Sequence, residues 1–254
     1  MVVTPFILST FIYNANTFIN QTIYQNIMMG EKSLSDILVA SQMGVAGKAV
    51  KISNIPIALA SAMATAMIPG ISGDFARKDL KGVREKVAKA MKVTMLISIP
   101  AAVGIGVLSK PVMWVLYPQK ESIDLASSLL SLLAVSVVFY AMSTLSNAVL
   151  QSVGKLNSPV INSAIALVLQ TGILIAMLQF LPEAFGPYYY IAAMVCYSLI
   201  VCILNAVSIR RSVSYKQEVG KTFVKPLLAS AIMGIVAFGV YQGLYLLTKI
   251  NIVA

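Results

Sequence analysis

Long apolar stretches separated by short polar connections dominate this sequence. A helix needs about 20 predominantly apolar residues to cross a bilayer, and the hydropathy pattern places seven such spans along the chain. They cover residues 3–28, 50–71, 90–109, 124–150, 159–181, 188–209 and 223–247. The pattern therefore predicts an all-α polytopic membrane protein.

The second apolar stretch, residues 37–75, is longer than one span requires, and it contains Lys48 and Lys51. Residues three apart share one face of a helix. In one interpretation, Gly44 and Gly47 break the helix, the residues before Gly47 form a short outer segment, and both lysines snorkel to the interface. In the other, both lysines line a water-filled cavity and bind an anion, because cations within a membrane usually mark a pathway.

Polar side chains recur at helical spacing in two other spans. In the first span, Asn14 and Gln21 lie on one stripe and Asn20 lies on the next. In the fourth span, the polar residues that recur at helical spacing are Ser136, Tyr140, Ser143, Asn147 and Gln151. Hydrogen bonding between helices is one explanation. Amides that faced lipid would lack partners at high cost, so for stripes of this length we favour a hydrated cavity. These five amides are then the predicted hydrogen-bonding groups for a substrate.

Positive charge is concentrated in alternate connections. The connections after the second, fourth and sixth spans hold thirteen of the 19 lysines and arginines, against four acids. By the positive-inside rule these connections are cytoplasmic, and so is the beginning of the chain. The net charge of +10 thus reflects membrane topology and lipid contact rather than nucleic-acid binding. Within the first basic connection, Val83, Val87 and Met91 predict a short amphipathic helix on the membrane surface.

The residue types needed for catalysis are missing or scattered. The sequence has no histidine, and its two cysteines, Cys196 and Cys202, have no metal-site spacing. No Gly-rich phosphate loop is present. Every acid lies in a connection or at the edge of a span, whereas proton- or sodium-coupled transport usually requires a carboxylate within the membrane. We therefore expect no enzymatic activity and no cofactor.

Three segments resemble the MurJ/SpoVB-type flippases of the multidrug/oligosaccharidyl-lipid/polysaccharide exporter superfamily. They read KISNIPIALASAMATAMIPGISGDFARKDLKGVREKV, PAAVGIGVLSKPVMWVLYP and NAVLQSVGKLNSPV. The shared pattern is a cation five residues before a proline, a run of small and apolar residues, a second proline, and then a basic connector. The resemblance covers residues 1 to about 247 and consists of patterns of helices and turns rather than a catalytic fingerprint.

The resemblance implies two lobes of six helices related by a pseudo-twofold axis, with two additional helices at the C-terminal end. Residues 1–209 then correspond to the second lobe, and residues 210–254 to a basic cytoplasmic linker and one accessory helix. The first lobe has no counterpart here, so it belongs to the same parent chain or to a separate polypeptide. In this family, cations in the central cavity bind the diphosphate of an undecaprenyl-linked sugar, and Lys51, five residues before Pro56, matches such a position.

The predicted function is therefore flipping of a lipid-linked oligosaccharide or peptidoglycan precursor across the bacterial cytoplasmic membrane by alternating access. The expected partners are that anionic lipid, the surrounding membrane lipids and the first lobe. The expected binding residues are Lys51, Lys48, Asn14, Asn20, Gln21, Asn147 and Gln151. Two alternatives stay open: a cation-coupled exporter of drugs or metabolites, and an inactive fragment or scaffold.

Overall fold

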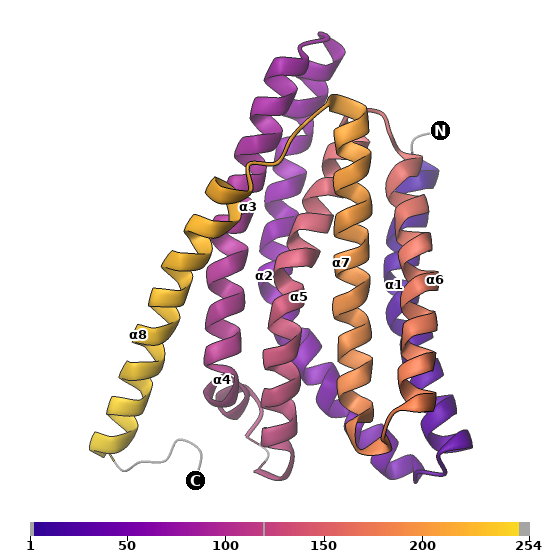
Figure 1. Ribbon diagram of the computed structural model, residues 1–254, viewed down its shortest axis with the longest axis vertical. Helices are drawn as coiled ribbons and strands as arrows, with labels where there is room; N and C mark the ends of the chain where they lie inside the picture. The colour runs from indigo at the N-terminus through magenta and orange to yellow at the C-terminus, as the bar shows by residue number, and fades with distance from the viewer. Residues whose placement is uncertain (1–2, 119, 249–254) are drawn as a thin grey trace.

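The computed structural model describes residues 3–118 and 120–248, and every element within them is helical (Figure 1). In chain order the elements are α1 (Val3–Gln25), η1 (Asn26–Glu31), α2 (Asp36–Ala76), α3 (Leu80–Val107), α4 (Ser109–Leu116), η2 (Lys120–Ser122), α5 (Ile123–Ser152), α6 (Asn157–Phe180), η3 (Glu183–Phe185), α7 (Gly186–Val213), η4 (Gly220–Val224) and α8 (Lys225–Thr248). Here η2 and η3 are single 3₁₀ turns, whereas η1 and η4 are π-helical turns.

The predicted membrane architecture is confirmed. Among the described residues, six helices are long and apolar enough to cross a membrane, namely α2, α3, α5, α6, α7 and α8. The remaining predicted span lies in α1, a helix of 23 residues that packs against α6 and α7. The protein is thus a multi-pass membrane protein.

Helix α2 is longer than the sequence pattern predicts. Its 41 residues begin directly after Ser35, whose side-chain oxygen accepts a hydrogen bond from the backbone N–H of Leu38 and caps the helix. The predicted break at Gly44 and Gly47 is wrong, because both residues lie inside the continuous helix. One glycine costs a helix only about 1 kcal/mol relative to alanine, which the packing of neighbouring residues can offset. Figure 1 shows that α2 changes direction along its length.

Helix α3 is also longer than the sequence pattern predicts. The backbone N–H of Gly82 donates to the Asp79 side chain at 2.9 Å and so caps the helix start. From there α3 continues without interruption to Val107, so the basic segment forms its first turns instead of a separate surface helix. Val83 and Val87 are fully buried. They pack into the bundle, which explains their spacing of four residues without a membrane-surface helix.

The core is organised around α5, which lies between α2, α3 and α7. Of its most apolar stretch, 61% is buried, compared with 17% for α8. Two large clusters of buried apolar side chains fill the two ends of the bundle. A smaller cluster between α2, α5, α6 and α7 contains Tyr140 and Tyr197. Polar side chains can therefore gather in the middle of the bundle without disrupting its packed ends.

Two features of the arrangement bear on topology. The connections from α2 to α3, from α5 to α6 and from α7 to η4 lie at one end of the molecule, where α1 also begins (Figure 1). These are the basic connections, so the positive charge is concentrated at that end. Helix α8 stands at the side of the bundle and packs on α3 (Figure 1). The division at residue 209 is a prediction that this arrangement does not test.

Candidate functional site

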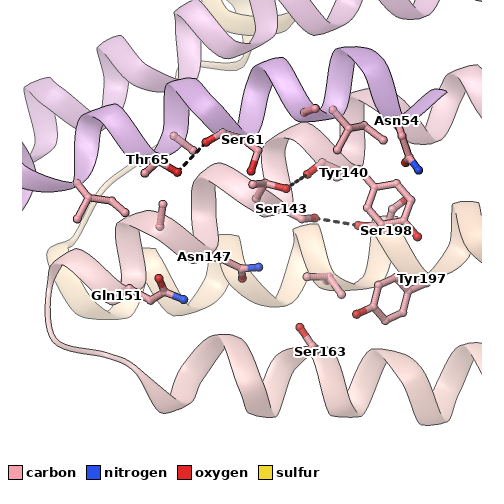
Figure 2. Close-up of a pocket in the computed structure, with 17 residues that line it drawn as sticks. Asn54, Ser61, Thr65, Tyr140, Ser143, Asn147, Gln151, Ser163, Tyr197 and Ser198 are labelled. Carbon is pink, nitrogen blue, oxygen red and sulfur yellow. Dashed lines mark hydrogen bonds between the residues drawn. The ribbon is translucent and has the colours of Figure 1, made fainter. Parts of the chain in front are cut away.

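A polar cavity opens between α2, α5, α6 and α7 in the middle of the bundle (Figure 2). Its volume is about 430 Å³. The polar side chains along it are Asn54, Ser61, Thr65, Tyr140, Ser143, Thr144, Asn147, Gln151, Ser163, Tyr197 and Ser198. The described lining holds no charged side chain, so the cavity offers hydrogen bonds rather than a fixed charge.

Helical spacing explains why these side chains converge. On α5, Tyr140, Ser143, Asn147 and Gln151 follow one another at three- and four-residue intervals and line the cavity. The polar stripe predicted for this span is thus confirmed for these four residues. Its first predicted member, Ser136, lies elsewhere: it is fully buried, and its hydroxyl donates to the Leu133 carbonyl at 2.6 Å.

Three hydroxyl groups of the cavity donate their protons to backbone carbonyls. Thr65 donates to the Ser61 carbonyl at 2.9 Å, and Thr144 donates to the Tyr140 carbonyl at the same distance. Ser143 donates across the bundle to the Ser198 carbonyl at 3.2 Å (Figure 2). A hydroxyl that donates in this way retains lone pairs. These three groups therefore present acceptors to the cavity, and the side-chain amides of its lining add donors.

Asn147 supplies such a donor because a neighbouring amide fixes its orientation. Asn205 on α7 donates from Nδ2 to the Asn147 Oδ1 at 2.7 Å. Asn162 on α6 donates to the Asn205 Oδ1 at 2.9 Å and to the Ser208 hydroxyl at 3.0 Å. The Asn147 oxygen is thus occupied, and its side-chain NH₂ remains available on the cavity side. Figure 2 shows Asn147 and Gln151 side by side along the cavity wall.

The sequence pattern did not identify Asn162 or Asn205. Each is a single amide within an otherwise apolar stretch, and neither belongs to a polar stripe. Both are buried. The available signal was their position inside the predicted spans 159–181 and 188–209, where an amide requires a partner. Which helix provides that partner depends on the three-dimensional arrangement.

Lys51 and Lys48 have different environments. Lys51 is exposed and precedes Asn54 by three residues, on the α2 stripe that continues through Ala58 and Ser61 along the cavity. Lys48 is half-buried, and its Nζ lies 5.5 Å from the centre of the Tyr117 ring, which is within the range of a cation–π interaction. Neither lysine lines the cavity itself. Lys51 lies one turn beyond the last described lining residue on α2.

Neither Asn20 nor Gln21, the two predicted amides of α1 whose side chains the structure describes, lines the cavity. Asn20 is fully buried in a reciprocal pair with Gln170 on α6: it donates to the Gln170 Oε1 at 3.1 Å and accepts from the Gln170 Nε2 at 2.6 Å. It also donates to the Asn16 Oδ1 at 3.1 Å. Gln21 is exposed, and the side chain of Asn14 lies outside the described residues. For Asn20, hydrogen bonding between helices therefore accounts for the amide.

Comparisons with known proteins agree with this arrangement. The lipid II flippase MurJ of Bacillus subtilis (strain 168) is 28% identical over 188 residues, which are 73% of this chain and 34% of that protein. A solved structure of lipid II flippase MurJ in an inward closed conformation has the same fold, with a TM-score of 0.69 at 19% identity. It covers 93% of this chain, and the match extends over 48% of that protein.

The chain therefore spans about a third to a half of the length of these relatives. The MatE family matches residues 15–178, from α1 to the last turn of α6. That segment includes the α2 and α5 walls of the cavity, together with most of the residues that line it. The chain belongs to the MatE family.

Proposed function

We propose that this chain forms one lobe of a flippase that moves a diphosphate-linked lipid oligosaccharide, of the peptidoglycan-precursor type, across the bacterial cytoplasmic membrane. The observation that carries the proposal is the polar cavity between α2, α5, α6 and α7, with an exposed lysine on the α2 stripe at its edge. The names of the two relatives, both lipid II flippases, support the choice of substrate.

The chemistry of the cavity suits an amphiphile with a polar head. A diphosphate requires a cation and N–H donors, which Lys51 and the side-chain amides of Asn54 and Asn147 provide. Sugar hydroxyls both donate and accept, and they match the acceptors at Ser143 and Thr144. An ammonium binds phosphate as a point charge without the two-pronged geometry of arginine. The proposed role of Lys51 is therefore to attract the diphosphate, and the amides orient it by hydrogen bonds.

The proposed reaction is translocation, and no covalent bond is made or broken. In transporters with repeated lobes, substrate binds between the lobes, which rock against each other. We propose that a second lobe closes over the cavity, from the same parent chain or from a separate polypeptide. The basic end of this lobe faces the cytoplasm in this proposal, following the charge distribution.

Replacement of Lys51 tests the proposal. In purified chain, Lys51→Ala should weaken binding of undecaprenyl diphosphate about 10- to 100-fold, the range expected for a hydrogen bond to a charged group. Lys51→Arg should retain binding. Lys81→Ala is a matched control, because it removes an exposed lysine from the first turn of α3, far from the cavity. Unchanged binding by Lys51→Ala would remove this lysine from the site.

A cation-coupled exporter is the second candidate, favoured by the MatE match itself. The described lining of the cavity contains no carboxylate, which such coupling usually requires. Transport measured in proteoliposomes, with a separately produced first lobe added, separates the candidates. Organic-cation export driven by a proton or sodium gradient would support the exporter, and lipid flipping without a response to either gradient would support the flippase. Inactivity in both assays would support a scaffold.

A further inference from the structure

A second cavity of about 430 Å³ lies at the basic end of the molecule, away from the one described above. It is bounded by α3, α5, α7 and the connection 214–219. Its residues are not those of the candidate flipping site. Nothing in the proposed translocation uses it, so its chemistry calls for its own explanation.

The inner part of this cavity is apolar and adaptable. Met91 on α3 and Met142 on α5 contribute buried thioether side chains, and α7 adds the exposed Ala206 and Val207 where the cavity opens to the surface. Methionine has three rotatable bonds and a polarisable sulfur, so it accommodates irregular apolar shapes. Val207 is 42% exposed. The apolar floor is therefore continuous with the outer surface of α7.

That outer surface forms an apolar track. Leu199, Ile203 and Val207 are exposed and follow one another at intervals of four residues, so they lie on one face of α7. The track leads from the middle of the helix toward its last turns, and Arg210 follows Val207 by one turn. An acyl chain that lay along the track would bring its head group to the mouth of the cavity.

The mouth is cationic. Arg210 and Lys216 line it, both are exposed, and neither forms an ion pair within the described part of the chain. The nearby acid Glu218 is engaged by Lys92 at 3.1 Å and by Lys221 at 3.6 Å. It does not line the cavity. The two cations are thus available to an external anion.

One buried amide group also lacks a partner. Gln217 lines the same cavity, and its Oε1 accepts a hydrogen bond from the Tyr215 hydroxyl at 3.1 Å. Its Nε2 is buried and has no hydrogen-bond partner among the described residues. A buried N–H group without an acceptor has lost its hydrogen bonds to water and gained none in return, which is unfavourable. A bound phosphate oxygen would satisfy it.

We propose that this cavity binds an anionic glycerophospholipid. The phosphate lies between Arg210 and Lys216, with Gln217 as an amide donor, and the first carbons of an acyl chain enter the floor beside Met142. The volume corresponds to about 14 water molecules at roughly 30 Å³ each. This is enough for a glycerophosphate head but not for whole chains, which extend along the α7 track. The inference does not depend on the proposed flipping activity.

Native mass spectrometry of the purified full chain with phosphatidylglycerol tests this site. The double variant Arg210→Gln/Lys216→Gln should weaken lipid binding about tenfold or more, because it removes both of the cations that attract the lipid phosphate. Its matched control is Arg211→Gln/Lys225→Gln, which removes two exposed cations from the same end without touching the cavity. Control binding should stay within about twofold of wild type.

A second variant and two competitors address the apolar half of the site. Ala206→Phe fills the floor and leaves both cations in place, so it should also reduce phosphatidylglycerol binding. Phosphatidylcholine, which has no net charge, should bind more weakly than phosphatidylglycerol. Equal losses in the two double variants would indicate diffuse surface charge and overturn the proposal. Displacement by inorganic phosphate, together with unaltered binding in Ala206→Phe, would overturn it in favour of a free-anion site.

Discussion

Buried amides connect the helices of this bundle at single residues. Asn20 pairs with Gln170 between α1 and α6, and Asn205 bridges Asn147 and Asn162 across three helices. Each amide both donates and accepts, so a pair satisfies itself in one relative position of the two helices. These contacts therefore set how the helices align along their length, in addition to holding them together.

The Asn20–Gln170 pair gives a residue-scale prediction. Asn20→Leu should destabilise the protein by about 1–3 kcal/mol, because it leaves the buried Gln170 amide without its partner. Gln170→Leu should destabilise the protein to a similar extent, because it removes the partner of the buried Asn20 amide. The double variant should be less destabilised than the sum of the two, since both polar groups are then removed.

Thermal unfolding in detergent measures this double-mutant cycle. Gln21→Leu is the control, since Gln21 lies on the same helix and is exposed, and it should change stability little. Strictly additive losses from Asn20 and Gln170 would show that the two amides do not stabilise each other.

The residue patterns available in the sequence explain part of the site. The α5 stripe from Tyr140 to Gln151 could be predicted because its polar residues repeat at helical spacing, and a repeated pattern marks one face. On α1, Asn20 belongs to a stripe with comparable spacing, but it faces α6, where it pairs with Gln170. Spacing identifies a face of a helix. It does not distinguish a face turned to a cavity from one turned to a neighbouring helix.

Among the elements, α8 is the least embedded, and its attachment depends on one glycine. A Cβ at Gly234 would lie 2.8 Å from the Val103 side chain and 3.4 Å from that of Val107, both on α3. Small residues allow such close approach of membrane helices. The Val103 contact is too close for any side chain without a shift of the helices.

We therefore predict that Gly234→Val displaces α8 from α3. A cysteine pair at Gly104 and Met233, where a Cβ at Gly104 would lie 4.0 Å from the terminal methyl group of Met233, should be joined efficiently by a short bismaleimide in the parent background and poorly in Gly234→Val. Gly239→Val is the matched control, because nothing lies within 4 Å of a Cβ at that position. Both native cysteines are replaced by alanine in all of these variants. Equal crosslinking in the two variants would contradict the prediction.

Helix boundaries were less predictable than helix number. The start of α2 at Asp36 depends on capping by Ser35, and hydropathy does not detect a cap. The sequence pattern placed a break at two glycines, although a glycine inside a packed helix is tolerated. The first turns of α3 were assigned to the membrane surface because valines spaced four apart among lysines suit either location. Tertiary packing decided between them.

For the whole molecule, the clearest regularity is the partition of charge between its two ends. Lys155 lies in the connection between α5 and α6 at the basic end, and Ala184 lies in the turn before α7 at the opposite end. The positive-inside rule predicts that the basic end faces the cytoplasm. The fold alone is equally compatible with either orientation in the membrane, so an experiment must decide.

Cysteine labelling of intact cells tests the orientation. In a background without native cysteines, a membrane-impermeant maleimide should label Ala184→Cys in intact cells, and Lys155→Cys only after permeabilisation. Both positions are exposed, so accessibility within the fold does not limit either reaction. The reverse labelling pattern would invert the proposed orientation.

The length of α2 has a mechanical consequence. At 1.5 Å per residue, its 41 residues extend over about 60 Å, roughly twice the hydrocarbon thickness of a bilayer. The cavity lies along its middle, so a tilt of about 10° there would move each end by about 5 Å, close to the rise of one helical turn. We therefore expect a tilt of α2 around a head group bound at the cavity to shift the connections at both ends of the helix, although its change of direction makes the straight distance between those ends shorter than about 60 Å.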